Sequence, residues 1–317
     1  IFRYHVAPYY FVVRQVGWAA FSFLILMYFK RADYRRMNSA TWAFSGLAVV
    51  VGLLVIVYFA DARTHRWFRF PGLGSFQPSE FAKPALILFL AYFISRRGHA
   101  INDRRTIMQA LIAIAMLAMM VVVADLGTAM VQVITAVLMF WIADLEKRHM
   151  ARVVAIGVLL VVVAICSRGY RLGRVVSYFD KDFTKLEMID PHGVIKDYIQ
   201  RSPVRDVSYQ PRQSKTAVGT GGVLGLGLMQ GWRELMFLPD AHTDFIFAVV
   251  GEEFGMVACI LIAATFAFIV LRGLLRLLRE PDYFVLLAGA GLLVQFGLQD
   301  RKSTRLNSSH VKRSRMP

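Results

Sequence analysis

Asp244 lies at the junction of a long polar loop and a long apolar segment. It follows the run Leu238-Pro-Asp-Ala-His242-Thr243 and precedes Phe245-Ile-Phe247. If the apolar segment crosses a bilayer, this carboxylate lies where water meets lipid, a costly position for a charge without a partner or a function. We therefore predict that Asp244 is the centre of a membrane-embedded active site.

A second polar cluster, in the run from Phe76 to Pro84, has the pattern of a helix start. Ser79 can cap the first free N–H groups, and Glu80 suits the positive end of the helix dipole. Glu80 and Lys83 share a helical face and can pair. Pro84 has no N–H for the carbonyl of Glu80, which is left available to a ligand or water. The alternative is an interfacial cap with a lysine that snorkels to water.

A third cluster, Gln213-Ser214-Lys215, precedes a glycine-rich run from Gly219 to Gly231. Glycines allow close backbone approach and exposed N–H groups, which suit phosphate. No Walker pattern is present, so nucleotide binding is not indicated. A flexible or re-entrant segment is the alternative.

The composition indicates a polytopic membrane protein. Hydrophobic residues make up 57% of the 317 residues, more than a soluble domain usually carries. They form blocks long enough to cross a hydrocarbon core of about 30 Å as helices. We predict an all-α bundle of eight transmembrane helices, at about 10–29, 39–60, 79–95, 107–123, 127–143, 151–166, 244–271 and 283–299.

The positive charges assign the two sides of the membrane. The net charge is +16, and many Lys and Arg residues lie in the short loops after the first, third, fifth and seventh blocks. The positive-inside rule places those loops in the cytoplasm and accounts for much of the charge without nucleic acid. The loop at 61–78 falls outside although it carries three arginines, which suggests that arginines such as Arg66 are retained for binding.

With the sides assigned, the ionisable residues of separate segments meet at the outer face. Glu80 and Lys83 lie at the outer end of the third block, and Asp125 lies in the short break between the fourth and fifth. Asp244 opens the seventh block from the same side. This convergence is the strongest functional signal in the residues themselves.

Two stretches differ from the membrane domain, predicted at 1–299. The extracytoplasmic loop at about 167–240 contains mixed charges and aromatics, and we consider both an amphipathic surface helix and a solvated loop for it. Residues 300–317 break from the preceding helix pattern and resemble a translated sequencing adaptor, so we predict a non-native tail there.

The chain resembles the SEDS family, which includes FtsW and RodA. The matching motifs are Gln77-Pro-Ser-Glu-Phe-Ala-Lys83, Asp125-Leu-Gly-Thr-Ala129, Gln213-Ser-Lys215 with its glycines, Leu238 to Ala248, and Gly251-Glu-Glu-Phe-Gly255. Asp240-Ala241 before the His-Thr-Asp run is closer to FtsW. The family has ten transmembrane helices, so we expect that the first and last are missing here. Ala124 and Pro84 depart from the family's pattern.

The resemblance implies a peptidoglycan glycosyltransferase that polymerises lipid II outside the membrane, at the division septum. It implies a class B penicillin-binding protein and other membrane proteins of the divisome as partners, and no nucleic acid. Asp244 matches the catalytic aspartate, which would take the proton of the acceptor hydroxyl. The predicted substrate-binding residues are Glu80, Lys83, Arg66, Asp125, Gln213, Ser214, Lys215, His242 and Thr243. Lys83, Lys215 and Arg66 would stabilise the leaving pyrophosphate.

Three alternatives stay open. A transporter that flips lipid II would also carry intramembrane charges and a broken glycine-rich segment. A polymerase of cell elongation would share the chemistry, and a scaffold of the division machinery would need none. The histidines show no metal-ligand spacing, although a divalent cation could assist at the pyrophosphate.

Overall fold

The computed structural model describes residues 10–61, 65–70, 74–167, 169–179, 190, 216, 218–227, 230 and 246–305. All eight predicted apolar segments are helices, which confirms the all-α membrane bundle. They are α1 (Tyr10–Arg31), α2 (Ala40–Ala60), α3 (Pro78–Arg96), α4 (Arg104–Ala124), α5 (Leu126–Ile142), α6 (Lys147–Cys166), α12 (Ile246–Leu277) and α13 (Tyr283–Arg305).

Five of the described helices, α1, α2, α4, α6 and α12, are long and apolar enough to cross a membrane. The apolar parts of α5 and α13, Leu126–Ile142 and Tyr283–Leu298, are shorter. The helix α13 continues past the predicted boundary at Gln299 to Arg305, because Arg and Lys are good helix formers. The remainder of the predicted tail lies outside the described residues.

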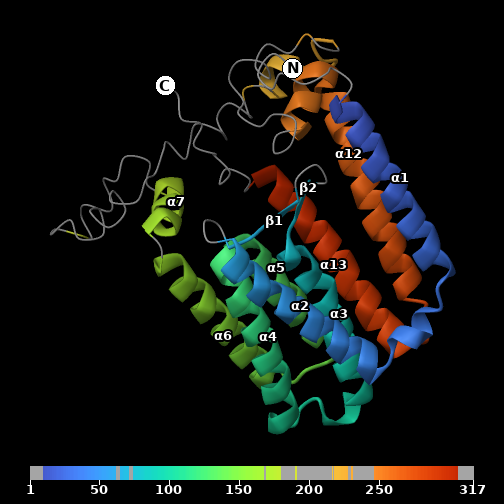
Figure 1. The fold of residues 1–317 in the computed structure, drawn as a ribbon, viewed down its shortest axis with the longest axis vertical. Helices are drawn as coiled ribbons and strands as arrows, with labels where there is room; N and C mark the ends of the chain where they lie inside the picture. Colours follow the sequence, from blue (N-terminus) through green and yellow to red (C-terminus); the bar gives the residue numbers. More distant parts are fainter. Residues whose placement is uncertain are drawn as a thin grey trace.

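Short connections make the helices run alternately up and down the bundle (Figure 1). The 3-10 helices η1 (Tyr34–Met37) and η2 (Gly98–Ala100) lie at one end, near the basic residues that follow α1 and α3. The strands β1 (Phe68–Phe70) and β2 (Gly74–Phe76) and the helix α7 (Gly169–Phe179) lie at the other. The arrangement matches the predicted alternation of sides.

The helix α3 is the centre of the bundle and packs against α2, α4, α5 and α13. Leu86, Leu90 and Ile94 form a buried stripe along it, at the four-residue spacing of one helical face. By contrast, the side chains described in α1 are nearly all exposed, and apolar ones are common among them. In a bilayer such a surface faces lipid chains.

One local feature differs from the prediction. The loop at 61–78 contains an antiparallel hairpin, with Phe68 paired to Phe76 and Phe70 paired to Gly74. The run was too short and too rich in arginine to be predicted as strands. The helix α7, which begins at Gly169, lies within the loop at about 167–240, for which a surface helix was one of the two hypotheses. Apart from Asp190, the stretch from 180 to 215 lies outside the described residues.

The close packing of α13 on α3 and α5 can be tested at Gly291. A Cβ there would lie 2.7 Å from Ile87 Cγ2 and 3.0 Å from Met139 Sδ, whereas a Cβ at Gly297 on the same helix has nothing within 4 Å. We expect Gly291→Val to lower the free energy of unfolding by about 1–3 kcal/mol through overpacking. Gly297→Val is the control, because it introduces the same poor helix former into the same helix without the steric contacts. Equal thermal stability of the two variants in nanodiscs would contradict the packing described.

Candidate functional site

Asp125 joins the hairpin segment to the break between α4 and α5. It is the C-cap of α4 and the N-cap of α5. Its carboxylate accepts hydrogen bonds from the Gly127 N–H at 2.9 Å and from the Thr128 hydroxyl at 2.9 Å. Arg66 Nη2 donates to the same carboxylate at 3.1 Å and forms an ion pair with it. The negative charge is thus held at a helix N-terminus, where the dipole also favours it.

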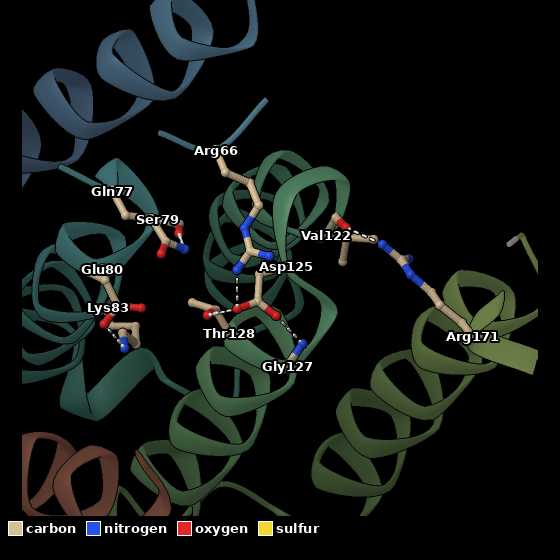
Figure 2. A network of polar contacts seen from close by, with 10 residues as sticks. All are labelled: Arg66, Gln77, Ser79, Glu80, Lys83, Val122, Asp125, Gly127, Thr128 and Arg171. Carbon is tan, nitrogen blue, oxygen red and sulfur yellow. Dashed lines mark hydrogen bonds and ion pairs between the residues drawn. The ribbon is translucent and has the colours of Figure 1, made fainter. Parts of the chain in front are cut away.

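Arg66 is held in place by the end of α2. Asp61 accepts from the backbone N–H of Arg66 at 3.3 Å and of Trp67 at 3.4 Å. His65 Nδ1 lies 2.7 Å from the carbonyl of Tyr58, and its ring stacks on the Tyr58 ring. Figure 2 shows the Arg66 side chain reaching from this segment to Asp125. Its Nε–H is buried and has no hydrogen-bond acceptor among the described residues.

The start of α3 differs from the prediction in one detail. The predicted cap Ser79 lies inside the helix, and the N-cap is Gln77, whose side chain makes no cap bond. The helix begins earlier because Pro78 occupies the first helical position, where its fixed φ is compatible and no N–H is needed. Instead, Gln77 Nε2 donates to the buried Ser79 hydroxyl at 2.6 Å.

The predicted pair of Glu80 and Lys83 is present, with Lys83 Nζ 2.6 Å from Glu80 Oε2. The two partners differ in exposure, because the Lys83 side chain is 3% exposed and that of Glu80 is 37%. Lys83 therefore carries its ammonium into the bundle rather than snorkelling out to water. The Glu80 carboxylate, by contrast, stays partly exposed.

Below Lys83, a narrow crevice between α3, α5 and α13 contains polar side chains that the sequence analysis did not single out. Gln132 and Thr135 of α5 and Gln295 of α13 line it. Neither side-chain atom of the fully buried Gln132 has a hydrogen-bond partner among the described residues. The spacing of Thr128, Gln132 and Thr135 on one face of α5 is the signal that could have found them.

Arg171 of α7 is a further residue that the sequence analysis missed. Its guanidinium donates to the carbonyl of Ala164 at 3.1 Å and to that of Val122 at 2.9 Å (Figure 2). Ala164 and Val122 lie in the last turns of α6 and α4, where carbonyls lack intrahelical partners and the dipole is negative. One buried arginine thus holds α7 against the outer ends of two helices.

The described site residues gather at one end of the bundle, from which α12 also begins. Arg66, Glu80, Lys83 and Asp125 lie there. Asp244, His242, Thr243, Gln213, Ser214 and Lys215 lie outside the described residues, as does the predicted proximity of Asp244 to Glu80. Within the described ranges, no three His, Cys, Asp or Glu residues are grouped so that they could hold a metal ion. The divalent cation therefore stays a prediction.

Comparison with known proteins adds independent information. The family model for FtsW, RodA and SpoVE, described as "Cell cycle protein", matches residues 2–301. A probable peptidoglycan glycosyltransferase FtsW from Geobacter metallireducens is 32% identical, over 92% of this chain and 74% of that protein. Stage V sporulation protein E of Bacillus subtilis is 30% identical, over 92% of this chain and 75% of its own length.

The fold is also similar to that of a solved structure, described as "Structural coordination of polymerization and crosslinking by a peptidoglycan synthase complex". The TM-score is 0.66 at 21% identity, over 92% of this chain and 78% of that chain. At this identity the similarity shows a shared fold, and it agrees with the helical membrane bundle described above.

The ion pair between Arg66 and Asp125 generates a prediction for stability. A double-mutant cycle with Arg66→Gln and Asp125→Asn is expected to give a coupling energy between about 0.5 and 3 kcal/mol, since the two side chains are in contact and partly buried. Unfolding free energies in nanodiscs provide the measurement. As a control, Arg97→Gln at the opposite end should combine with Asp125→Asn additively. Additivity of the Arg66 cycle would show that the pair contributes no coupling.

Proposed function

Since the chain belongs to the FtsW, RodA and SpoVE family of cell cycle proteins, we propose that it is a peptidoglycan glycosyltransferase of the bacterial cytoplasmic membrane. It polymerises lipid II, a disaccharide-peptide on undecaprenyl pyrophosphate, into glycan strands at the outer face. The observation that carries the proposal is the gathering of Arg66, Asp125, Glu80 and Lys83 at the end of the bundle from which α12 begins.

The proposed reaction needs a base and a stabilised leaving group. The acceptor hydroxyl attacks the anomeric carbon of the donor sugar, the bond from that carbon to the phosphate oxygen breaks, and undecaprenyl pyrophosphate leaves. Asp244 takes the proton that the hydroxyl loses. Asp244 precedes Ile246, the first residue of α12, by two positions in the sequence.

Cations near the leaving group supply the electrostatic part of the mechanism. Arg66 is oriented by Asp125, and its guanidinium is partly exposed, so it can place a positive charge beside a phosphate oxygen. Lys83 carries a positive charge into a site from which water is largely excluded, where charges interact more strongly than in water. Lys215, Gln213 and Ser214 complete the pyrophosphate site in this proposal, and His242 and Thr243 flank the base.

The transporter hypothesis requires polar side chains along the whole crossing, and α5 provides a test of it. Its buried polar face contains Thr128, Gln132 and Thr135. Beyond Thr135 the buried residues are Ala136, Met139 and Phe140, which are apolar to the end of the helix. A polar face that stops partway into the bundle supports chemistry at the outer face over passage through it.

We further propose that the enzyme acts at the division septum with a class B penicillin-binding protein and other membrane proteins of the divisome. The description of the family as "Cell cycle protein" supports the role in division, and the similarity of the fold to a member of a peptidoglycan synthase complex supports a partner in cell-wall synthesis. A role in elongation, as in RodA, is the alternative.

Asp244→Asn tests the assigned base in the full-length protein with its transpeptidase partner. The substitution keeps the size of the side chain and removes the proton acceptor. General-base assistance contributes about 10²–10⁴-fold in rate, so polymerisation of lipid II should fall at least about 100-fold. Membrane insertion and partner binding should survive. Asp103→Asn, an exposed carboxylate at the opposite end without a side-chain cap bond, is the control.

The same variant separates the alternatives. Normal polymerisation by Asp244→Asn together with failed flipping of lipid II would favour the transporter. Normal polymerisation and flipping with failed recruitment to the septum would favour the scaffold.

Lys83→Ala tests the assigned cation. Loss of one group that stabilises developing charge typically lowers turnover by about 10²-fold, and we expect a fall of that order from weaker phosphate stabilisation and a displaced Glu80. Lys30→Ala, which removes an exposed lysine at the opposite end of the bundle, should leave polymerisation unchanged. Equal rates for the two variants would remove Lys83 from the site.

A further inference from the structure

The helix α12 is broken inside the bundle at Gly255. This residue has φ 74° and ψ −171°, which lie outside the helical region and suit glycine. A break in a membrane helix frees N–H and C=O groups that lipid cannot satisfy. The carbonyls of Glu252 and Glu253 and the N–H groups of Met256 and Val257 flank this break, so they need partners from another part of the chain.

The glycine-rich run supplies those partners in both directions. Leu226 N–H donates to the carbonyl of Glu252 at 3.0 Å, and Gly227 N–H donates to that of Glu253 at 3.0 Å. In return, Met256 N–H donates to the carbonyl of Gly222 at 3.0 Å, and Val257 N–H to that of Val223 at 3.3 Å. We call this reciprocal pairing of residues 221–227 with residues 251–257 the glycine interlock.

The interlock requires glycine because the two backbones are in direct contact. A Cβ at Gly221 would lie 2.0 Å from the Gly251 carbonyl oxygen, and a Cβ at Gly225 would lie 2.1 Å from that of Glu253. A Cβ at Gly255 would lie 2.4 Å from the backbone nitrogen of Gly225. These neighbours are backbone atoms and cannot rotate away as the end of a side chain can. Gly219, by contrast, has open space around its Cβ position.

A continuous helix would satisfy the same backbone groups without any partner segment. The break is therefore not needed for helix formation. Its effect is that a loop segment sets the direction of the part of α12 that precedes the break. That part, from Ile246 to Phe254, begins two residues after Asp244 in the sequence. The loop segment itself follows Lys215 in the sequence, so the interlock ties the run after the predicted phosphate ligands to the helix after the predicted base.

We propose that the glycine interlock is a positioning element that sets the placement of Asp244 relative to the outer-end cations, with Gly221, Gly225 and Gly255 as positioning residues. The proposal rests on the proposed glycosyltransferase function. The interlock acts on the geometry of the base and not on substrate affinity, so its loss lowers kcat more than it changes KM. Misplacement of a catalytic group by about 1 Å can cost about 10²-fold in rate.

The test compares Gly225→Ala with Gly297→Ala, where a Cβ has nothing within 4 Å, in the full-length protein in nanodiscs. Hydrogen–deuterium exchange reads the interlock amides of Leu226, Gly227, Met256 and Val257 directly. In Gly225→Ala we expect their exchange to accelerate while exchange in α3, α4 and α5 is unchanged. The kcat for lipid II should fall at least about 10-fold, with KM within about 3-fold. Gly297→Ala should match the parent in both measurements.

A second pair of variants, with a weaker steric clash, tests the proposal if Gly225→Ala does not fold. A Cβ at Gly251 would lie 2.9 Å from Val218 Cγ2, which belongs to the loop segment. Gly251→Ala should therefore lower kcat, and adding Val218→Ala should restore it by making room. A merely structural defect would lower the amount of folded protein without this rescue.

The outcomes separate the interlock from the proposed function. Rapid exchange of the four amides in the parent would show that the interlock does not form, and an opened interlock with unchanged kcat would show that it does not position the base. Protected amides together with full polymerisation by Asp244→Asn would overturn the role of Asp244 and leave the interlock as a structural feature alone.

Discussion

Backbone polar groups inside a bilayer must find partners within the protein, and this constraint explains where the chain departs from regular helices. Between α4 and α5 the chain leaves the helix for a single residue, and the Asp125 side chain binds the N–H of Gly127 at the start of the next helix. In α12 the chain breaks at Gly255, and a second segment supplies four backbone hydrogen bonds. Arg171 binds the terminal carbonyls of two further helices.

These departures lie toward the end of the bundle where the predicted chemistry takes place. Regular helices pair their own backbone N–H and C=O groups and present mainly apolar side chains. A break leaves some of these groups unpaired, and charged side chains then cap them. Asp125 illustrates the consequence, since the carboxylate that caps α5 also orients Arg66. One carboxylate therefore caps a helix and also orients a candidate phosphate ligand.

The sequence predicted the eight helices well because apolar blocks of sufficient length have few other structures available in lipid. It also predicted the pair of Glu80 and Lys83, which depends only on helical spacing. The contact between Arg66 and Asp125 joins residues 59 positions apart, and no local pattern encodes such a pairing. The cap at Ser79 was predicted wrongly because Pro78 starts the helix earlier. We considered the glycine-rich run as a phosphate loop or a re-entrant segment. Its pairing with α12 joins two segments that are distant in the sequence, and no local pattern encodes it.

In the proposed reaction, lipid II binds at the outer end of the bundle and reacts between Arg66 and Asp244. The most direct measurement is a cryo-electron microscopy structure of the full-length protein with lipid II bound. We expect the pyrophosphate against the Arg66 guanidinium, and the Asp244 carboxylate within about 2.6–3.2 Å of the acceptor hydroxyl or one water away. A pyrophosphate bound at the opposite end near Arg97, or an Asp244 carboxylate directed away from the sugar, would contradict it.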